Sequence, residues 1–454
     1  MHLSRPIVIG IRRENEKKFE ARVPLIPAHI EQLQQQFLGA VTFIIQPSPL
    51  RTFTDDEFAQ VGAIVQEDLS DADLILCIKE VYPDQLINDK VYLVFAHVIK
   101  GQPDNMPVLQ ALLDRGITLI DYESITNPYG KRQVFFGYSA GQTGMFETLR
   151  ALGQRLTAQG KPCIFNQLKP VYAYADLAAA KQHLSEISVQ IQQDPTLLGV
   201  TEYPLVFAFA GLGNVGQGAL DVFDLLPTEE VLPSQLADWF KAGSYPSGKV
   251  FKCLLGKPDL LRNGDRPFDA DDYNAYPDRY HSCLTDLLPY LSVLLNCVFW
   301  SSQYPRILPK DGFRSAWLRG DRRLQVVGDL SCDPPAGSVA CTVQAGDLYH
   351  PVFGYEPIEG EVVDAFAADA VTVMAVDNLS AGLPKDASIA FSTMLKAFIP
   401  ALINADFNRS TLSTLPSELF RAVVTHQHTL TPRYRYLEPC LRNYFAAHPC
   451  ETLI

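Results

Sequence analysis

A glycine-rich segment in the middle of the chain constrains its fold more than any other feature. The apolar run Leu205–Ala210 leads directly into Gly-Leu-Gly-Asn-Val-Gly, which places a G-x-G-x-x-G spacing between a strand-like run and a helix-like stretch. In such a unit the first glycine allows a tight turn, the second lets the backbone approach a pyrophosphate, and the third lets the helix pack closely on the strand. The residues predicted to bind a dinucleotide are Gly211, Gly213, Asn214, Val215 and Gly216. A tight turn that holds no ligand is the alternative interpretation.

The residues that follow the glycines leave the identity of the nucleotide open. In this type of domain an acidic residue about 20 positions further on binds the ribose 2′-hydroxyl of NAD, whereas an arginine accommodates the 2′-phosphate of NADP. The expected second strand ends near Val231 and Leu232, with Glu229 and Glu230 before or inside it. No arginine marks a phosphate pocket there. NAD and NADP are therefore both compatible with the sequence.

Short apolar runs alternate with amphipathic stretches on both sides of the glycine segment. This alternation is typical of parallel sheets that are covered by helices on both faces. The helical stripe in Ala140–Leu156 and the helical pattern that begins at Pro384 predict two crossings between domains. We therefore expect an α/β protein with two doubly wound, Rossmann-like domains. The expected substrate domain comprises residues 1–138 and 386–454, and the expected dinucleotide domain comprises residues 139–385.

The composition limits the classes of partner. Lys and Arg number 38 against 51 Asp and Glu, a net charge of −13 that argues against nucleic acid or an anionic membrane as partner, because both need a basic face. No apolar run is long enough to span a membrane. The nine cysteines are odd in number and form no C-x-x-C pair, which favours reduced thiols over a disulfide frame or a zinc cage. We expect a cytoplasmic protein without a metal site.

Charged residues follow several apolar runs of the first expected domain. Arg12, Arg13 and Glu14 follow the first run, and Lys79 and Glu80 follow another. His97 follows the next, with Lys100 three residues later, and Glu123 lies just after a third. Because the carboxyl ends of parallel strands meet at one edge of a sheet, we expect these side chains to converge. One charged strand end is usually just solvated, but several of them in a chain with a dinucleotide motif favour a site for a carboxylate-rich substrate.

The same segments resemble a known family. They are Ile9–Glu14, Gln46-Pro47-Ser48, Glu67–Ser70, Lys79-Glu80, Phe95-Ala96-His97 with Lys100-Gly101-Gln102, Asn105-Met106-Pro107, Leu119–Glu123, and Asp377-Asn378-Leu379 with Leu383-Pro384. They are similar to the saccharopine dehydrogenase (lysine-forming) family, and most similar to its lysine–2-oxoglutarate reductase branch, the N-terminal half of the bifunctional aminoadipic semialdehyde synthase. The resemblance runs from about residue 7 to about residue 440. It implies an alanine dehydrogenase-like fold whose first domain is built from both chain ends.

The resemblance also implies a reaction. The ε-amine of lysine would condense with 2-oxoglutarate to an imine, and hydride from NADH or NADPH would reduce this imine to saccharopine. Carried over by motif, Lys79 and His97 would be the acid/base pair. Glu80 and Glu123 would lie beside them at the substrate and tune their pKa values. Proton transfers at nitrogen and at the carbinol oxygen suit a His and a Lys of lowered pKa.

The remaining implied residues bind charged groups of the ligands. They are Arg22, Lys100 and Arg132 for substrate carboxylates, and Asp377 near the nicotinamide half of the cofactor. Saccharopine carries three carboxylates, and several cations would form charge-assisted hydrogen bonds with them. Because the saccharopine-cleaving half is absent from the sequence, the protein alone would stop at saccharopine. A separate saccharopine-cleaving dehydrogenase would then be its partner.

Two other interpretations compete with this one. An amino-acid dehydrogenase related to alanine dehydrogenase would keep the glycine loop and a Lys/His pair, but it would need fewer cations because pyruvate has one carboxylate. The combination of Arg22, Lys100 and Arg132 favours the larger substrate. A catalytically silent subunit that binds cofactor or substrate and regulates a partner is the third interpretation. The presence of both Lys79 and His97 argues against it.

Overall fold

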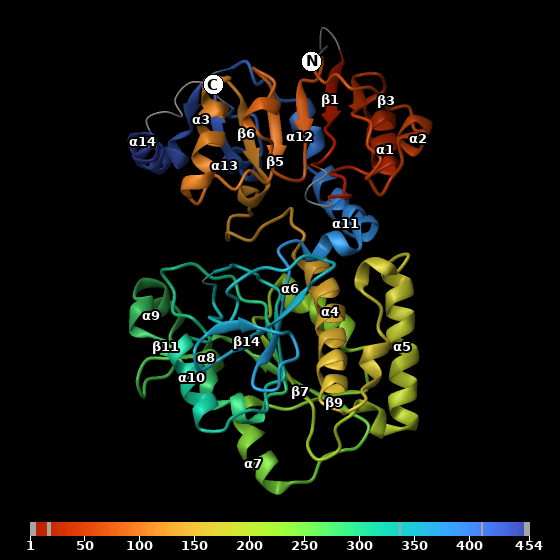
Figure 1. Cartoon of the computed structure of the whole chain (residues 1–454). Helices are drawn as coiled ribbons and strands as arrows, with labels where there is room; N and C mark the ends of the chain where they lie inside the picture. The colour runs from red at the N-terminus through yellow and green to blue at the C-terminus, as the bar shows by residue number, and fades with distance from the viewer. Residues whose placement is uncertain (1–5, 16–19, 336, 410–411, 449–454) are drawn as a thin grey trace. The chain divides into compact units, whose positions relative to one another are not determined.

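The chain folds into two compact α/β units (Figure 1). The computed structural model describes residues 6–15, 20–335, 337–409 and 412–448. The first unit combines Met1–Phe136 with Pro384–Ile454, and the second unit is Gly137–Leu383. The predicted class, two doubly wound domains with the first completed by the C-terminal segment, is confirmed. The chain passes from one unit to the other at 136/137 and again at 383/384, in each case two residues before the expected boundary (138/139 and 385/386).

The sheet of the first unit has the strand order β18-β17-β6-β5-β4-β1-β2-β3. Its strands are β1 (Ile7–Ile11), β2 (Val41–Ile45), β3 (Ile64–Val65), β4 (Leu74–Leu76), β5 (Val91–Val94), β6 (Thr118–Asp121), β17 (Val423–His426) and β18 (Thr429–Leu430). The first six are parallel, and β17 joins β6 in the antiparallel sense. The chain order reverses at β1, which has β2 on one side and β4 on the other. Ligands of open α/β sheets bind at such a reversal, outside the carboxyl ends of the strands.

Helices cover both faces of this first sheet. They are α1 (Pro27–Phe37), α2 (Asp55–Gln60), α3 (Met106–Asp114), α11 (Pro384–Lys396), α12 (Ile399–Ile403), α13 (Ser417–Ala422) and α14 (Glu438–Ala447). Strand β4 shows why its continuous apolar run forms a central strand: Leu74 and Leu76 pack into one hydrophobic core and Ile75 packs into the other. Successive side chains of a strand point to opposite faces, so a strand buried on both faces must be apolar throughout.

The sheet of the second unit has the order β15-β14-β16-β13-β12-β7-β9-β8. Its strands are β7 (Val206–Ala210), β8 (Thr228–Glu230), β9 (Val250–Leu255), β12 (Val293–Asn296), β13 (Val326–Asp329), β14 (Val352–Glu356), β15 (Glu361–Val363) and β16 (Val371–Ala375). A separate two-stranded antiparallel sheet pairs β10 (Leu261–Arg262) with β11 (His281–Ser282). The strand expected near Val231 is therefore β8, which ends at Glu230 and lies at the sheet edge. The strand beside β7 is β9.

The helices of the second unit include the first crossing segment. They are α4 (Gly137–Ala158), α5 (Leu177–Gln193), α6 (Asn214–Phe223), α7 (Leu236–Ala242), α8 (Lys257–Leu260), α9 (Ala270–Ala275) and α10 (Lys310–Leu318). Glycines let α4 and α6 approach each other closely, because a Cβ at Gly141 or Gly218 would lie 2.0 Å from the backbone oxygen of Val215 or Tyr138. Within the described ranges, no helix has the length and apolar character needed to cross a membrane.

Candidate active site

The glycine loop of the second unit connects β7 to α6. Gly211 has a φ of +92°, in the left-handed region that favours glycine, and a Cβ there would lie 2.9 Å from the backbone oxygen of Cys297. A Cβ at Gly216 would lie 2.2 Å from the oxygen of Gly211, so this glycine is needed for close packing of the helix on the strand. A Cβ at Gly213, in contrast, would meet no described atom within 4 Å. Gly211 and Gly216 therefore have no room for a side chain, whereas Gly213 leaves open the space where a pyrophosphate would approach.

The start of α6 can receive an anion. Gly213 precedes the helix without a side-chain cap, so the first backbone N–H groups, from Asn214 to Gly216, have no capping side chain. Uncapped N–H groups and the helix dipole together favour a phosphate at this position. The loop and the helix start fit the dinucleotide that the sequence predicts there.

Asp377 lies in the same unit, just after β16, and its side chain is exposed. In the strand order, β16 lies on the same side of β7 as β12, whereas β9 lies on the other side of β7. A nicotinamide that extends from the glycine loop past β12 would lie on the Asp377 side. The structure does not test the role expected for Asp377, which stays a prediction.

In the first unit, Glu14 joins the ends of the two strands at the reversal of the chain order. Glu14 follows β1, and its carboxylate accepts hydrogen bonds from the backbone N–H of Ile78 (2.6 Å) and of Lys79 (3.0 Å), which follow β4. Burial raises the pKa of Glu14 to about 7, with a further contribution from the Glu20 carboxylate. The sequence places Glu14 among the charges at the strand ends, but it assigns no role to this residue. Lys79 is half-buried, and its ammonium forms no ion pair with any described residue.

Glu80 and His97 meet across β4 and β5. The Nε2 atom of His97 lies 3.9 Å from Oε2 of Glu80, and both residues are half-buried. His97 has a φ of +55°, which is rare for a residue with a side chain, and its carbonyl accepts a hydrogen bond from the Asn105 side chain (2.8 Å). Backbone strain of this kind is concentrated at functional sites. The structure thus brings Glu80 and His97 together with the Lys79 turn, as the sequence predicted for these strand ends.

The end of β6 supplies a third acidic group. Oε1 of Glu123 accepts a hydrogen bond from Arg132 at 2.7 Å, whereas its Oε2 is buried without a hydrogen-bond partner among the described residues. Asp121 accepts the backbone N–H of Glu123 at 2.9 Å. Burial raises the pKa of Asp121 to about 7, and the neighbouring Glu123 carboxylate adds to the shift. Glu123 therefore holds the guanidinium of Arg132, the residue expected to bind a substrate carboxylate.

The other two expected cations differ in their surroundings. Arg22 is only 3% exposed: its Nε donates to Glu20 at 2.7 Å, its Nη2 also donates to Glu20, and its guanidinium lies 4.0 Å above the Phe136 ring. Phe136 in turn stacks on Phe391 at 4.4 Å. Lys100 lies in the turn after β5 and is exposed. Lys100 is thus accessible to a ligand, whereas Arg22 is already neutralised and packed.

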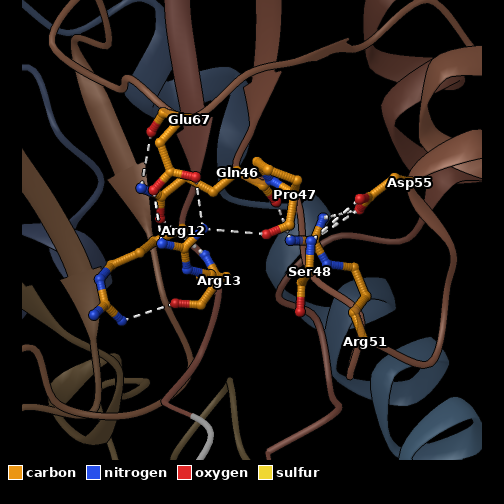
Figure 2. Close-up of polar contacts among 8 residues, drawn as sticks. All are labelled: Arg12, Arg13, Gln46, Pro47, Ser48, Arg51, Asp55 and Glu67. Carbon is orange, nitrogen blue, oxygen red and sulfur yellow. Dashed lines mark hydrogen bonds and ion pairs between the residues drawn. The ribbon is translucent and has the colours of Figure 1, made fainter.

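Figure 2 shows a second group of cations at the ends of β1 and β2. The guanidinium of Arg13 binds Glu67 at 2.6 and 2.7 Å, and the Arg13 backbone N–H donates to the Gln46 side chain at 3.2 Å. Arg51 is buried, donates to the Gln46 carbonyl and lies 3.8 Å from Asp55. Acids neutralise both arginines, and the Gln46 side chain binds the Arg13 backbone. We therefore interpret the Gln46-Pro47-Ser48 segment as structural, holding the end of β1 in place.

Among the described residues, no group of three His, Cys, Asp or Glu side chains has the geometry to hold a metal ion. Ionisable side chains stand at the carboxyl ends of the strands on this edge of the sheet. The structure pairs Glu14 with the Lys79 backbone, Glu80 with His97 and Glu123 with Arg132, after the ends of β1, β4, β5 and β6. They can donate and accept protons and bind a carboxylate.

Residues 10–142 match the family described as "Alanine dehydrogenase/PNT, N-terminal domain". The chain is 34% identical over 447 residues to an alpha-aminoadipic semialdehyde synthase of Arabidopsis thaliana, a match that covers 95% of this chain and 41% of that protein. It is 32% identical over 449 residues to the mitochondrial alpha-aminoadipic semialdehyde synthase of Mus musculus, covering 95% and 47%. A "Saccharopine dehydrogenase [NAD(+), L-lysine-forming]" of Yarrowia lipolytica is 24% identical over 412 residues, covering 88% and 93%. The chain spans less than half the length of the two synthases.

Solved structures show the same fold. An L-alanine dehydrogenase superposes with a TM-score of 0.57 at 15% identity, covering 96% of this chain and all of that one. A transhydrogenase from Sinorhizobium meliloti superposes with a TM-score of 0.53 at 12% identity, covering 93% and 98%. At these identities the likeness concerns the fold alone. It agrees with the expected alanine dehydrogenase-like arrangement of two Rossmann-like domains.

Proposed function

We propose that the chain is an NAD(P)-dependent oxidoreductase of the saccharopine dehydrogenase type that interconverts L-lysine plus 2-oxoglutarate with saccharopine, a proposal supported by its similarity to the aminoadipic semialdehyde synthases and to a saccharopine dehydrogenase. The observation that carries the proposal is the meeting of Glu80 and His97 beside the Lys79 turn, at the edge of the sheet where ligands bind. The open glycine loop of the second unit provides for the cofactor.

The reaction needs proton transfers that this edge can supply. The lysine ε-amine adds to the carbonyl carbon of 2-oxoglutarate, and loss of water from the resulting carbinolamine gives an imine. Lys79 and His97 are the groups that remove the proton from the amine nitrogen and deliver one to the leaving oxygen. The glycine loop would hold the dinucleotide, which would supply hydride to the imine carbon, and a proton on nitrogen would complete saccharopine. Glu80, 3.9 Å from the imidazole, orients His97 for this work.

Glu123 has the capacity to bind the amine end of the substrate. A buried carboxylate oxygen without a partner costs about 1–3 kcal/mol, and a ligand N–H that binds it recovers that free energy. Oε2 of Glu123 is such an atom among the described residues, while Oε1 stays with Arg132. The amine or iminium nitrogen of the substrate carries a suitable donor.

Arg132 and Lys100 are the cations in this proposal that bind substrate carboxylates directly. Both are accessible, and the guanidinium of Arg132 keeps donors that Glu123 does not use. Arg22 would contribute only if a substrate carboxylate displaced Glu20 from it. Arg22 is therefore less suited than Arg132 or Lys100 to bind a substrate carboxylate directly.

An activity assay tests the function. The purified protein is given NADH or NADPH with lysine plus 2-oxoglutarate, and in parallel with pyruvate plus ammonia. We expect nucleotide oxidation only with the first pair. Faster oxidation with pyruvate plus ammonia would establish the alanine dehydrogenase-like alternative. Nucleotide binding without oxidation under either condition would establish the silent regulatory subunit.

A further inference from the structure

We propose that Arg12 binds the α-carboxylate of the lysine substrate, as a third cation of the substrate site beside Arg132 and Lys100. This assignment deepens the proposed function and rests on it. Saccharopine carries three carboxylates, whereas only two of the expected cations are accessible, because Arg22 is already paired with Glu20. One carboxylate of the product therefore needs a cation that the expected set does not supply.

Arg12 lies at the edge of the first sheet where ligands bind. It is the first residue after β1, the strand at which the chain order reverses. Its backbone N–H donates to the carbonyl of Leu76, the last residue of β4, at 3.1 Å. Two residues further along the chain, the Glu14 carboxylate holds the backbone N–H of Lys79. Arg12 is thus placed beside the strand whose end leads to Lys79 and Glu80, at the carboxyl edge of the sheet.

The guanidinium of Arg12 is hydrogen-bonded to neutral groups. Its Nη1 donates to the Arg13 carbonyl at 2.8 Å, and its Nη2 donates to the side-chain oxygen of Gln85. Within the described part of the chain, no carboxylate forms an ion pair with it. A guanidinium has five N–H donors, so three of those of Arg12 remain for a ligand.

The nearby carboxylate of Glu14 does not neutralise this charge. The positive charge of Arg12 lowers the pKa of Glu14, but burial nevertheless raises that pKa to about 7, so the group is partly protonated near neutral pH. Both of its oxygens are also used, because they accept the backbone N–H groups of Ile78 and Lys79. A substrate carboxylate is therefore the stronger partner that Arg12 can find at this edge.

Figure 2 shows how Arg12 differs from the neighbouring Arg13. Both side chains are half-buried, but the Arg13 guanidinium binds both carboxylate oxygens of Glu67, at 2.6 and 2.7 Å. Gln85 ends the short 3-10 helix Pro83–Gln85, which follows Glu80, and its bond directs the Arg12 guanidinium toward this segment. A guanidinium that is held in place without a neutralising acid is suited to a bidentate contact with a carboxylate.

The length of lysine agrees with this position. His97 follows β5, and β4 lies between β5 and β1, so the strand of Arg12 is two strand spacings, about 10 Å, from that of His97. Six bonds separate the ε-nitrogen of lysine from its carboxyl carbon, about 7.5 Å when extended, and the arginine side chain covers the remainder. In 2-oxoglutarate only three bonds separate the reacting carbon from the far carboxyl carbon, about 4 Å. The shorter substrate thus suits Arg132, after the adjacent strand β6, and the longer one suits Arg12.

Steady-state kinetics with lysine and with pentane-1,5-diamine test the assignment. The diamine is lysine without its carboxylate and keeps both amines. We expect the unmodified protein to have a kcat/KM for lysine about 10- to 100-fold above that for the diamine, the usual effect of a charge-assisted contact. Arg12→Gln should lower kcat/KM for lysine by about this factor and leave the values for the diamine, 2-oxoglutarate and the nucleotide within about twofold. Arg12→Lys keeps the charge without the planar fork, so its value for lysine should fall between the two.

Arg13→Gln is the matched control. It removes the adjacent arginine, whose charge Glu67 already neutralises at an exposed ion pair, and it should change none of these values by more than about twofold. Melting temperatures of all three variants show whether the fold is intact. Should Arg12→Gln fail to fold, the lysine-to-diamine ratio of Arg12→Lys decides.

Several outcomes would overturn the assignment. Equal use of lysine and the diamine by the unmodified protein, or equal losses for both in Arg12→Gln, would show that Arg12 does not bind the lysine carboxylate. A higher KM for 2-oxoglutarate alone would show that Arg12 binds the other substrate. A lower melting temperature of Arg12→Gln with an unchanged preference for lysine would make Arg12 a structural residue. Absence of lysine-dependent nucleotide oxidation by the unmodified protein would instead refute the proposed function, and the assignment with it.

Discussion

The carboxylate of Glu14 accepts the backbone N–H of Lys79 at 3.0 Å, although the two residues are 65 positions apart in the sequence. One follows β1 and the other follows β4, so the bond crosses the point where the order of the strands reverses. An ionised carboxylate only accepts hydrogen bonds, and here it accepts two, from Ile78 as well as Lys79. The position of the Lys79 backbone, and hence the direction in which its side chain leaves, depends on Glu14.

We expect Glu14→Gln to reduce kcat by at least about tenfold, with little change in nucleotide affinity. The amide keeps one acceptor but presents an NH2 group to the second backbone N–H, which leaves a donor unsatisfied at a cost of about 1–3 kcal/mol. The glycine loop belongs to the other unit and should not respond. Glu67→Gln, which weakens an exposed ion pair with Arg13, is the control. An unchanged kcat with a lower melting temperature would show that Glu14 only stabilises the fold.

The stability of the protein should fall as the pH rises from about 5 to about 8. Glu14 and Asp121 have pKa values of about 7 in the folded chain, above their ordinary values of 4.5 and 3.8. Between those values the folded state holds more protons than the unfolded state, so the free energy of unfolding decreases with rising pH, on the order of 1–3 kcal/mol per group. Urea unfolding at several pH values measures this. Glu14→Gln and Asp121→Asn should each flatten the dependence, and an unchanged slope in both would contradict the assignment.

The sequence was sufficient for the fold class because the relevant signals are local. The apolar run of β4, buried on both faces, and the glycines after β7 each specify a strand or a turn from adjacent residues. The position of β8 could not be predicted in this way, since Thr228–Glu230 is short and largely exposed and the order of strands is set by distant pairings. The strand expected about 20 residues after the glycines is β8, and the strand that lies beside β7 is instead β9.

Part of the candidate site, the charged residues at the strand ends, was also predictable from the sequence. Residues at strand ends, such as Glu80 and His97, could be placed together because parallel strands share one edge. The pairing of Arg22 with Glu20 and its packing on Phe136 depend on a side-chain arrangement that no sequence pattern encodes. The sequence therefore predicted that Glu80 and His97 lie close together, but it did not show that Arg22 is already neutralised.

Gly213→Val should abolish nucleotide binding without unfolding the protein. A Cβ at Gly213 meets no described atom within 4 Å, so the side chain fits the free fold and occupies the space that a pyrophosphate needs. Gly216→Val is the contrasting variant, because its Cβ would lie 2.2 Å from the Gly211 oxygen and should destabilise the fold itself. Nucleotide titration and melting temperature on both variants separate the two effects. Normal nucleotide affinity in Gly213→Val would remove this loop from the binding site.

Arg132→Ala should weaken substrate binding, whereas Arg22→Ala should lower the stability of the fold. Arg132 is half-buried and accessible, so its removal should raise the KM for 2-oxoglutarate or saccharopine by roughly 30- to 1000-fold and leave the KM for the nucleotide unchanged. Arg22→Ala would remove the cation that neutralises the buried Glu20 carboxylate, at a cost of about 3–5 kcal/mol of stability. Steady-state kinetics and urea unfolding distinguish the two. A pure KM effect in Arg22→Ala would show that Arg22 binds substrate after all.

Lys79→Met and His97→Gln should each lower kcat by about 10²–10⁴-fold, the usual effect of losing a positioned proton donor or acceptor. Nucleotide affinity should barely change, because both residues lie in the first unit. Each variant should lose one limb of the pH profile of kcat. The double variant should lose less than the product of the two single losses, since residues that act as one unit are not additive.

The control for these two variants is Lys100→Met, an exposed lysine near the same edge, which should raise a substrate KM and keep both limbs of the pH profile. His97 could instead be needed for its backbone, given its φ of +55° and the bond from Asn105 to its carbonyl. Asn105→Ala separates these roles, because it removes the bond and leaves the imidazole. If Asn105→Ala and His97→Gln lowered the melting temperature equally, and His97→Gln left the pH profile intact, His97 would be a structural residue. Loss of a pH limb in His97→Gln at an unchanged melting temperature would identify the imidazole as the group that moves the proton.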